Sequence, residues 1–190
     1  MTTLTSSQTY SPELTGDYQI DAAHTRLGFV ARHAMVSKVR GAFKGFEGAF
    51  HLDAEDPTKS SVNLTIEVAS VDTGVEQRDE HLRNNDFFDA PTYPQITFAS
   101  TKIEPAGDQA FNVTGDLTIR GTTKSVTLQL ELTGAAKDPY GNERVGFEGS
   151  TVINRKDFGV NFNAVLEAGG VMVSEKITLE LDVEAVKTAA

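Results

Sequence analysis

Most of this chain alternates apolar and polar residues with a period of two, and this alternation constrains its fold more than any other feature. Clear runs are residues 62–68, 111–120 and 126–133, and the clearest is the last one, residues 171–184. Neighbouring side chains on a β-strand point to opposite faces, so each run places one apolar face against a core. We count eight strand-like segments, mostly joined by short turns, and no helical stretch long enough to cover a parallel sheet. The sequence therefore predicts an all-β antiparallel protein.

The choice between a sandwich and a closed barrel depends on glycines inside the strands. Gly41, Gly45 and Gly48 lie close together in one of these segments, where they suggest the bends or bulges that a closing barrel requires. Closure also removes exposed sheet edges. We therefore expect an eight-stranded antiparallel barrel over residues 17–187, preceded by a flexible tail over residues 1–16. A barrel of eight strands is just wide enough to hold one small or slender ligand.

One long segment interrupts the strand pattern, and we call it the crossover (residues 74–98). It combines many charged residues with two adjacent Phe and two Pro. Thr73 and Glu76 have the spacing of a capping box, which predicts a short polar helix from Glu76 to Arg83, within residues 74–84. Two Asn follow directly, and Asn tolerates the left-handed conformation that ends many helices.

The role of the crossover depends on Phe87 and Phe88, which follow the helix and precede both Pro. In one interpretation the crossover is a lid or plug at the mouth of the barrel. In the other it is a surface helix whose two Phe pack into the core. The spacing alone favours the second, because most loops carry no function of their own.

Composition excludes several classes of partner. The 190 residues carry a formal net charge of −10, which argues against a nucleic-acid partner. It also disfavours docking on anionic membranes, although it leaves room for a local basic patch. The chain has no Cys, so it forms no disulfide and no Cys-based zinc site. No apolar run approaches the ~20 residues of a spanning helix, and we expect no membrane insertion. The first residues lack the features of a secretory signal, so we expect a cytoplasmic protein.

Catalytic motifs are missing from the pattern of residues. The sequence has no G-x-S-x-G, and its four His, at positions 24, 33, 51 and 81, lack metal-type spacing. No Gly-rich phosphate loop opens a long helix. We therefore predict no catalytic residue, no metal and no cofactor other than a bound lipid. Two alternatives stay open: an enzyme acting on a small hydrophobic substrate in the same cavity, or a structural module with a filled barrel. A homodimer is compatible with each of these.

Several strings, taken together, resemble a known family. YQIDAAHTRLGFVARH opens the domain with His24 and His33, and RDEHLRNNDFFDAPTYPQITFAST spans most of the crossover; GDLTIRGTTKSVTL and NRKDFG follow. In this order and at these spacings the chain resembles the YceI-like family of polyisoprenoid-binding proteins over about residues 18–186. The resemblance implies a lipocalin-like antiparallel barrel whose long apolar channel holds an isoprenoid, an isoprenoid quinone or a similar amphiphilic chain. Some members of this family are periplasmic.

The apolar strand faces supply candidate ligand-binding residues for such a channel. A ligand of ~30 heavy atoms, at about 0.3 kcal/mol per atom, would gain roughly 9 kcal/mol, which is enough for sub-micromolar binding. The alternative is that these side chains fill a dry core, as inward residues of small barrels usually do. The apolar candidates are Phe29, Phe46, Phe50, Ile66, Phe87, Phe88, Phe98, Leu117, Leu128 and Leu179.

Specificity would depend on a few polar groups at one end of the channel. Arg binds diphosphates well because its planar guanidinium donates to two oxyanions at once. His33 shares a strand face with Phe29 and is expected to point into the channel, with a core His bonded to the backbone as the alternative. For Arg78 we favour local surface pairing. The polar candidates are Arg26, His33, Arg40, His81 and Arg83, with Arg155 and Lys156 as a weaker pair.

Overall fold

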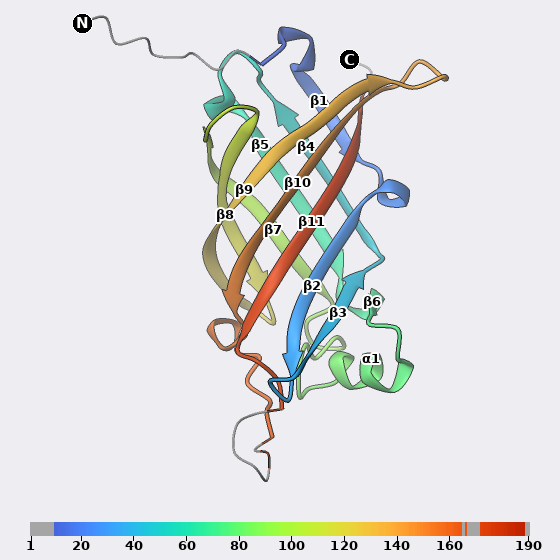
Figure 1. Cartoon of the computed structure of the whole chain (residues 1–190), viewed down its shortest axis with the longest axis vertical. Helices are drawn as coiled ribbons and strands as arrows, with labels where there is room; N and C mark the ends of the chain where they lie inside the picture. Colours follow the sequence, from blue (N-terminus) through green and yellow to red (C-terminus); the bar gives the residue numbers. More distant parts are fainter. Residues whose placement is uncertain (1–9, 165, 167–171, 189–190) are drawn as a thin grey trace, which may run out of the picture.

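The computed structural model describes residues 10–164, 166 and 172–188. Within them the chain forms eleven strands, one α-helix and five short 3-10 turns (Figure 1). The strands are β1 (Gly16–Ile20), β2 (Arg26–His33), β3 (Ser37–Phe43), β4 (Phe46–Leu52), β5 (Ser61–Glu67), β6 (Val71–Asp72), β7 (Gln95–Pro105), β8 (Ala110–Ile119), β9 (Thr122–Lys137), β10 (Glu143–Asn154) and β11 (Lys176–Lys187). The helix is α1 (Glu76–Arg83), and the 3-10 turns are η1 (Pro12–Leu14), η2 (Ala22–His24), η3 (Pro57–Lys59), η4 (Val68–Ser70) and η5 (Arg155–Phe158).

Eight of these strands close into a barrel. Their order is β1-β4-β5-β7-β8-β9-β10-β11, every pairing is antiparallel, and Tyr18 in β1 pairs with Lys187 in β11 to close the ring. Beyond this pairing β11 continues alongside β2, which is followed by β3 and β6. In the sequence, η2 connects β1 to β2. Because β2 pairs with β11 beyond the point where β1 does, the β2–β3 hairpin lengthens the barrel wall. The predicted eight-stranded antiparallel barrel is confirmed.

Glycines inside the strands make room for aromatic rings that face the interior. A Cβ atom on Gly115 would lie 2.5 Å from Cζ of Phe98, and one on Gly41 would lie 2.4 Å from Cζ of Phe29. Atoms at such distances overlap, so a side chain at either position would force the neighbouring ring to move. These two glycines therefore serve ring packing in addition to any bending of the strands.

One end of the barrel is covered by residues that precede β1. Tyr10 is only 2% exposed, stacks on Phe111 with ring centroids 4.6 Å apart, and donates its hydroxyl hydrogen to the carbonyl of Ala110. The predicted tail over residues 1–16 is therefore wrong for Tyr10 and η1, and its first nine residues lie outside the described residues. A Tyr that stacks and hydrogen-bonds gains enough to order a short segment.

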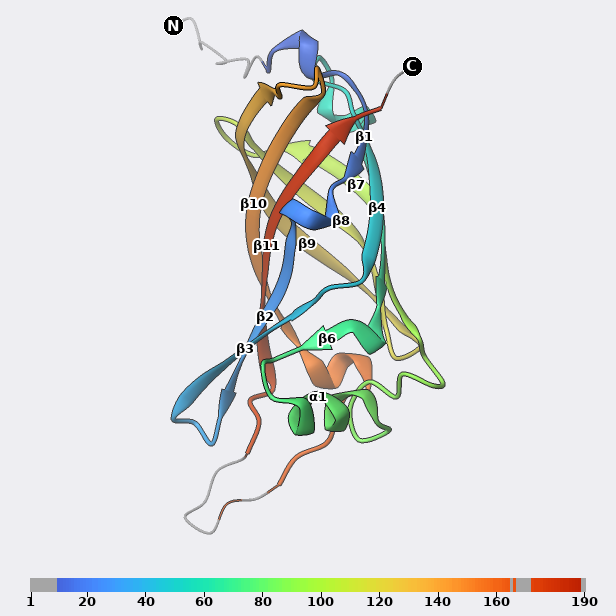
Figure 2. The same cartoon turned by 90° about the vertical axis from the view of Figure 1, so that its right-hand side faces the viewer.

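The crossover lies across the opposite end of the barrel, where Figures 1 and 2 both place α1. The helix has the predicted bounds, Glu76–Arg83, but the predicted capping box is wrong. No side chain caps the first turn. Asp79 instead ties the helix to the residues before it, because its Oδ1 accepts from the backbone N–H of Thr73 at 2.8 Å. Asp79 is 4% exposed, whereas Glu76 is exposed. The helix ends at Asn84 in an extended conformation instead of a left-handed one.

Neither α1 nor the 3-10 turns in the described part of the chain have the length and apolarity that a bilayer-spanning helix needs.

Candidate ligand-binding channel

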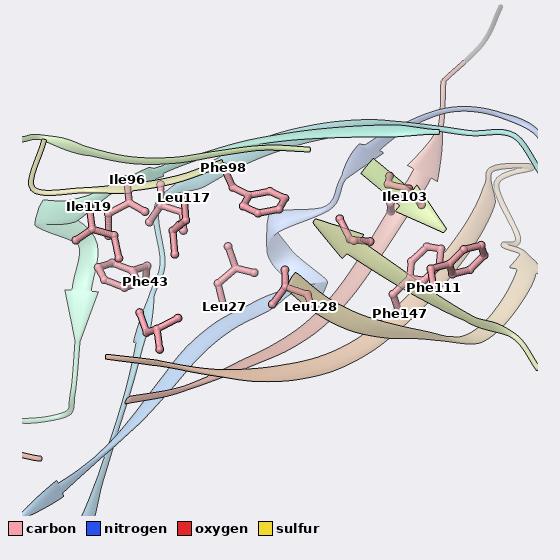
Figure 3. Packing of buried hydrophobic residues seen from close by; sticks show 14 of the residues in the cluster. Leu27, Phe43, Ile96, Phe98, Ile103, Phe111, Leu117, Ile119, Leu128 and Phe147 are labelled. Atoms are coloured by element: carbon pink, nitrogen blue, oxygen red, sulfur yellow. The ribbon is translucent and has the colours of Figure 1, made fainter. Parts of the chain in front are cut away.

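The barrel interior contains two apolar cavities that meet at three leucines. The first cavity has a volume of about 110 Å³ and the second about 170 Å³. Leu27, Leu64 and Leu181 line both, and we call these three side chains the waist. In Figure 3, Leu27, Phe98 and Leu128 lie between two groups of core side chains, one nearer the crossover and one nearer β1. The interior is therefore hollow in two places and narrow between them.

The size of these cavities limits what the barrel holds without rearrangement. A protein cavity of about 150 Å³ binds a guest of the size of benzene, so each cavity accommodates on the order of six to ten heavy atoms. The ~30 heavy atoms expected from the sequence exceed this space. A long chain therefore fits only if the three waist side chains turn aside and join the cavities.

Most of the predicted apolar residues line the cavities. Phe50, Phe98 and Leu128 line the first cavity. The second is lined by Phe29, Ile66, Phe87, Phe88, Leu117 and Leu179. Phe46 lines neither and packs against the core from a half-buried position. The alternation that identified these residues works because the two faces of each barrel strand have different surroundings.

The crossover closes the second cavity with both of its Phe side chains. Phe87 is buried, and Phe88 packs edge-on against Phe43 with ring centroids 5.7 Å apart. From the turn that follows β8, Nη1 of Arg120 donates to the carbonyls of Phe87 at 3.1 Å and Gly159 at 3.2 Å. Arg120 thus joins the crossover to the turn that follows β10. The crossover therefore combines features of both interpretations: its two Phe side chains pack into the core, and the same side chains cover the end of the barrel.

Arg155 places a buried cation at the same end of the channel. It is 5% exposed and lines the second cavity. Its Nε, Nη1 and Nη2 atoms donate to the carbonyls of Ser174, Val160 and Val173 at 2.8, 2.7 and 3.2 Å. Burial lowers the pKa of the guanidinium, while the charge of Glu175 acts in the opposite direction. A guanidinium carries five N–H hydrogens, and these three contacts use one on each of its nitrogens.

Apart from Arg155, the polar candidates from the sequence lie away from the cavity. Arg26 and Arg40 face outward and contact Glu180 at 3.7 and 3.3 Å. The expectation that His33 points into the channel is wrong, because His33 is exposed where the β2–β3 hairpin extends past the barrel. Lys156 is paired with Glu175 at 2.8 Å on the outside. The alternation of side chains shows which face of a strand a residue lies on, but it does not show where the barrel wall ends.

The remaining candidates act within the crossover. Nε2 of His81 lies 2.8 Å from Oδ2 of Asp86, and its ring packs edge-on against Phe87. Arg83 donates to Glu76 at 2.9 Å. Arg78 is paired locally, as favoured, although its partners are the hydroxyl and carbonyl of Thr73 and not a carboxylate. These side chains hold the crossover in place and do not reach the second cavity.

One group of metal-type side chains lies on the outer wall of the described barrel. Asp21, His24 and Glu184 bring one ligand atom each within 4.8 Å of one another. Arg144 already donates to Asp21 at 2.8 Å and to Glu184 at 3.2 Å. The hydrogen bond from Arg144 is the main cause that lowers the pKa of Asp21. The guanidinium of Arg144 therefore occupies the position that a metal ion would need, and Asp21, His24 and Glu184 form an ion-pair network with it.

Fold and site together define a class: a lipocalin-like closed antiparallel barrel with a hollow apolar interior and one end covered by a crossover. Comparison with known proteins then identifies the family. The sequence profile described as "YceI-like domain" matches residues 18–185. The chain therefore belongs to the YceI-like family.

Individual relatives agree with this assignment. The chain is 44% identical over 146 residues to "Protein YceI" of Escherichia coli O157:H7, covering 76% of each chain. The structure of BcnA from Burkholderia cenocepacia is 30% identical, with a TM-score of 0.77 over 87% of this chain and 98% of that one. A domain from Saccharophagus degradans, described as polyisoprenoid-binding and implicated in plant cell wall breakdown, has a TM-score of 0.68 at 17% identity, over 90% and 98% of the two chains. That last likeness shows the fold alone.

Proposed function

We propose that this protein binds the hydrocarbon chain of a long amphiphile, such as a polyisoprenoid, an isoprenoid quinone or a fatty-acid-like lipid, inside its barrel, and carries or stores it without chemical change. The observation that supports this most is the pair of apolar cavities that share the waist as a common wall. A relative of the same fold is described as polyisoprenoid-binding, which agrees with the proposal. The proposal includes no reaction, because the channel is lined almost entirely by aliphatic and aromatic side chains.

The energetics of the proposal depend on removing apolar surface from water. Each methylene buried contributes about 0.8 kcal/mol, so a chain that enters both cavities gains more with every added isoprene unit. Opening the waist costs rotamer changes at Leu27, Leu64 and Leu181, and these are small beside the gain from a long chain. We therefore expect affinity to rise with chain length.

We place the polar head of the ligand at the crossover end. Arg155 lines the second cavity, where three backbone carbonyls hold its guanidinium. The first cavity has His51, Ser60 and Ser61 at its edge but no charged Arg or Lys in its lining. A phosphate or carboxylate head is therefore favoured near Arg155. Changing Arg155 to Met should weaken binding of geranylgeranyl phosphate more than binding of geranylgeraniol.

Solvent extraction of the purified protein followed by mass spectrometry tests the proposal directly. We expect an amphiphile with a long apolar chain at a stoichiometry approaching one per barrel. Native mass spectrometry of the same sample should show the matching mass shift. Purified protein that carries no such molecule, and that takes up neither farnesol nor geranylgeraniol when offered them, would contradict the proposal.

A further inference from the structure

A basic segment stands out in this acidic chain. Residues 22–46 contain no Asp or Glu but carry Arg26, Arg32, Lys38, Arg40 and Lys44, although the formal net charge of the chain is −10. These residues build β2, β3 and the connection between them. Figure 2 shows the β2–β3 hairpin projecting past the barrel at the end where α1 lies. The positive charge is therefore concentrated on one projecting element.

Two of these cations have no anionic partner among the described residues. Arg26 and Arg40 contact Glu180, and Lys44 contacts Asp72 at 3.1 Å. Arg32 and Lys38 lie directly opposite each other in the β2–β3 register. Like charges placed directly opposite on neighbouring strands destabilise the pairing. The folded chain by itself therefore gains nothing from this arrangement.

The connection between the two strands is equally unfavourable in isolation. Met35 is 68% exposed and Val36 is 80% exposed. Ala34 and Met35 have φ of 51° and 60°, in the left-handed region where Gly, Asn and Asp are the usual residues of a tight hairpin. We call residues 32–38 the tip. Apolar exposure, like-charge opposition and left-handed Ala and Met all occur within it.

We propose that the tip docks on the surface of an anionic lipid bilayer. Side chains such as those of Met35 and Val36 gain by entering the boundary between head groups and acyl chains. Arg32 and Lys38 gain by approaching lipid phosphates, which also removes the cost of their mutual repulsion. The same surface repels the acidic remainder of the chain. Attraction of the tip and repulsion of the remainder together favour an orientation in which the tip faces the bilayer. The net negative charge of the whole chain disfavours docking on an anionic membrane, but the β2–β3 hairpin is locally positive.

Docking by the tip would also orient the channel. Ala31, at the base of the tip in β2, lines the second cavity together with Phe87 and Phe88 of the crossover. The tip and the covered end of the channel therefore lie at the same end of the barrel (Figures 1 and 2). The inference goes beyond the proposed function and does not depend on it, since the tip residues lie outside both cavities.

Sedimentation with vesicles tests the inference with delipidated full-length protein. Vesicles of phosphatidylcholine containing phosphatidylglycerol are compared with vesicles of phosphatidylcholine alone. We expect binding to the anionic vesicles only, and a fall in that binding as salt is added. Lys38→Glu changes two units of charge at the tip, so we expect roughly a twenty-five-fold loss of vesicle affinity, at about five-fold per unit. The melting temperature should not fall, because a carboxylate opposite Arg32 forms a favourable cross-strand pair.

A second variant and two matched controls separate the tip from general charge and hydrophobicity. Met35→Asn with Val36→Ser removes the apolar surface, suits the left-handed backbone and should weaken vesicle binding without loss of stability. Lys137→Glu makes the same charge change at the end of β9, and Tyr140→Ser removes a 90% exposed aromatic from the β9–β10 connection, at the far end of the barrel. Both controls should bind vesicles as the unchanged protein does.

Three outcomes would overturn the inference. One is equal binding of the unchanged protein to neutral and anionic vesicles, or to neither. Another is a loss with Lys137→Glu as large as the loss with Lys38→Glu. The third is full vesicle binding by the Met35→Asn, Val36→Ser variant. None of these depends on whether the barrel retains a lipid, because the vesicles are free of ligand and the protein is delipidated.

Discussion

Leu64→Trp tests whether the two cavities act as one channel. Leu64 lies in β5 and lines both cavities. An indole at this position would occupy the space between them and separate the second cavity from the first. Overpacking of this kind usually costs about 1–3 kcal/mol of stability, and the neighbouring cavities provide room that limits the cost. The barrel should therefore fold while its channel is blocked in the middle.

The expected effect follows from the number of atoms on each side of the waist. Each isoprene unit adds five heavy atoms, which at about 0.3 kcal/mol per atom gives roughly 1.5 kcal/mol, or about a ten-fold gain in affinity. The unchanged protein should show this gain from geraniol to farnesol and on to geranylgeraniol. In the Leu64→Trp variant a longer chain has nowhere to go, so affinity should level off beyond the length that the second cavity accepts.

Competition against a fluorescent fatty acid, measured for a series of prenols, gives these affinities. Leu132→Trp is the matched control, because Leu132 packs against the core but lines neither cavity. The control should keep the dependence on chain length. If Leu64→Trp keeps the same ten-fold gain per unit as the unchanged protein, the ligand does not pass the waist and our description of the channel is wrong.

Three further predictions concern the wall, the crossover and the surface network. Gly115→Ala should lower the free energy of unfolding by about 2 kcal/mol and the melting temperature by roughly 4–8 °C, whereas Gly134→Ala, where an added Cβ meets nothing within 4 Å, should change little. Arg120→Met removes two hydrogen bonds that join the crossover to the turn after β10 and should speed hydrogen exchange of the crossover amides; unchanged exchange would contradict that role. The hydrogen bond from Arg144 lowers the pKa of Asp138 below its unperturbed 3.8. The stabilisation by this pair is therefore present above about pH 4 and is lost as the pH falls further. Between about pH 7 and pH 3 the melting temperature of Arg144→Met should fall less steeply than that of the unchanged protein.

The sequence predicted the barrel well because the physical signal is repeated in every strand. Apolar residues on alternate positions require one buried face, and an antiparallel meander that buries all of them closes readily. The same alternation placed Phe29, Phe98 and Leu117 in the cavity walls. The helix bounds were also predictable, since two Asn follow it directly.

The rest depended on contacts between residues far apart in the chain, which no local pattern shows. Tyr10 stacks on Phe111, and the buried Asp79, instead of Glu76, makes the hydrogen bond to Thr73. Arg155 is only a weaker candidate in the sequence, yet it is buried beside the second cavity and donates to three backbone carbonyls. His33 follows strand parity but lies beyond the barrel wall. The waist is invisible in sequence, because its three leucines come from β2, β5 and β11.

The most direct test of a channel that admits a slender guest is a crystal structure of the protein with a prenol brominated at its far end. We predict anomalous density for bromine inside the first cavity, continuous chain density past Leu27, Leu64 and Leu181, and changed rotamers at these three side chains. A bromine position outside the barrel, with the waist closed as it is here, would contradict the account.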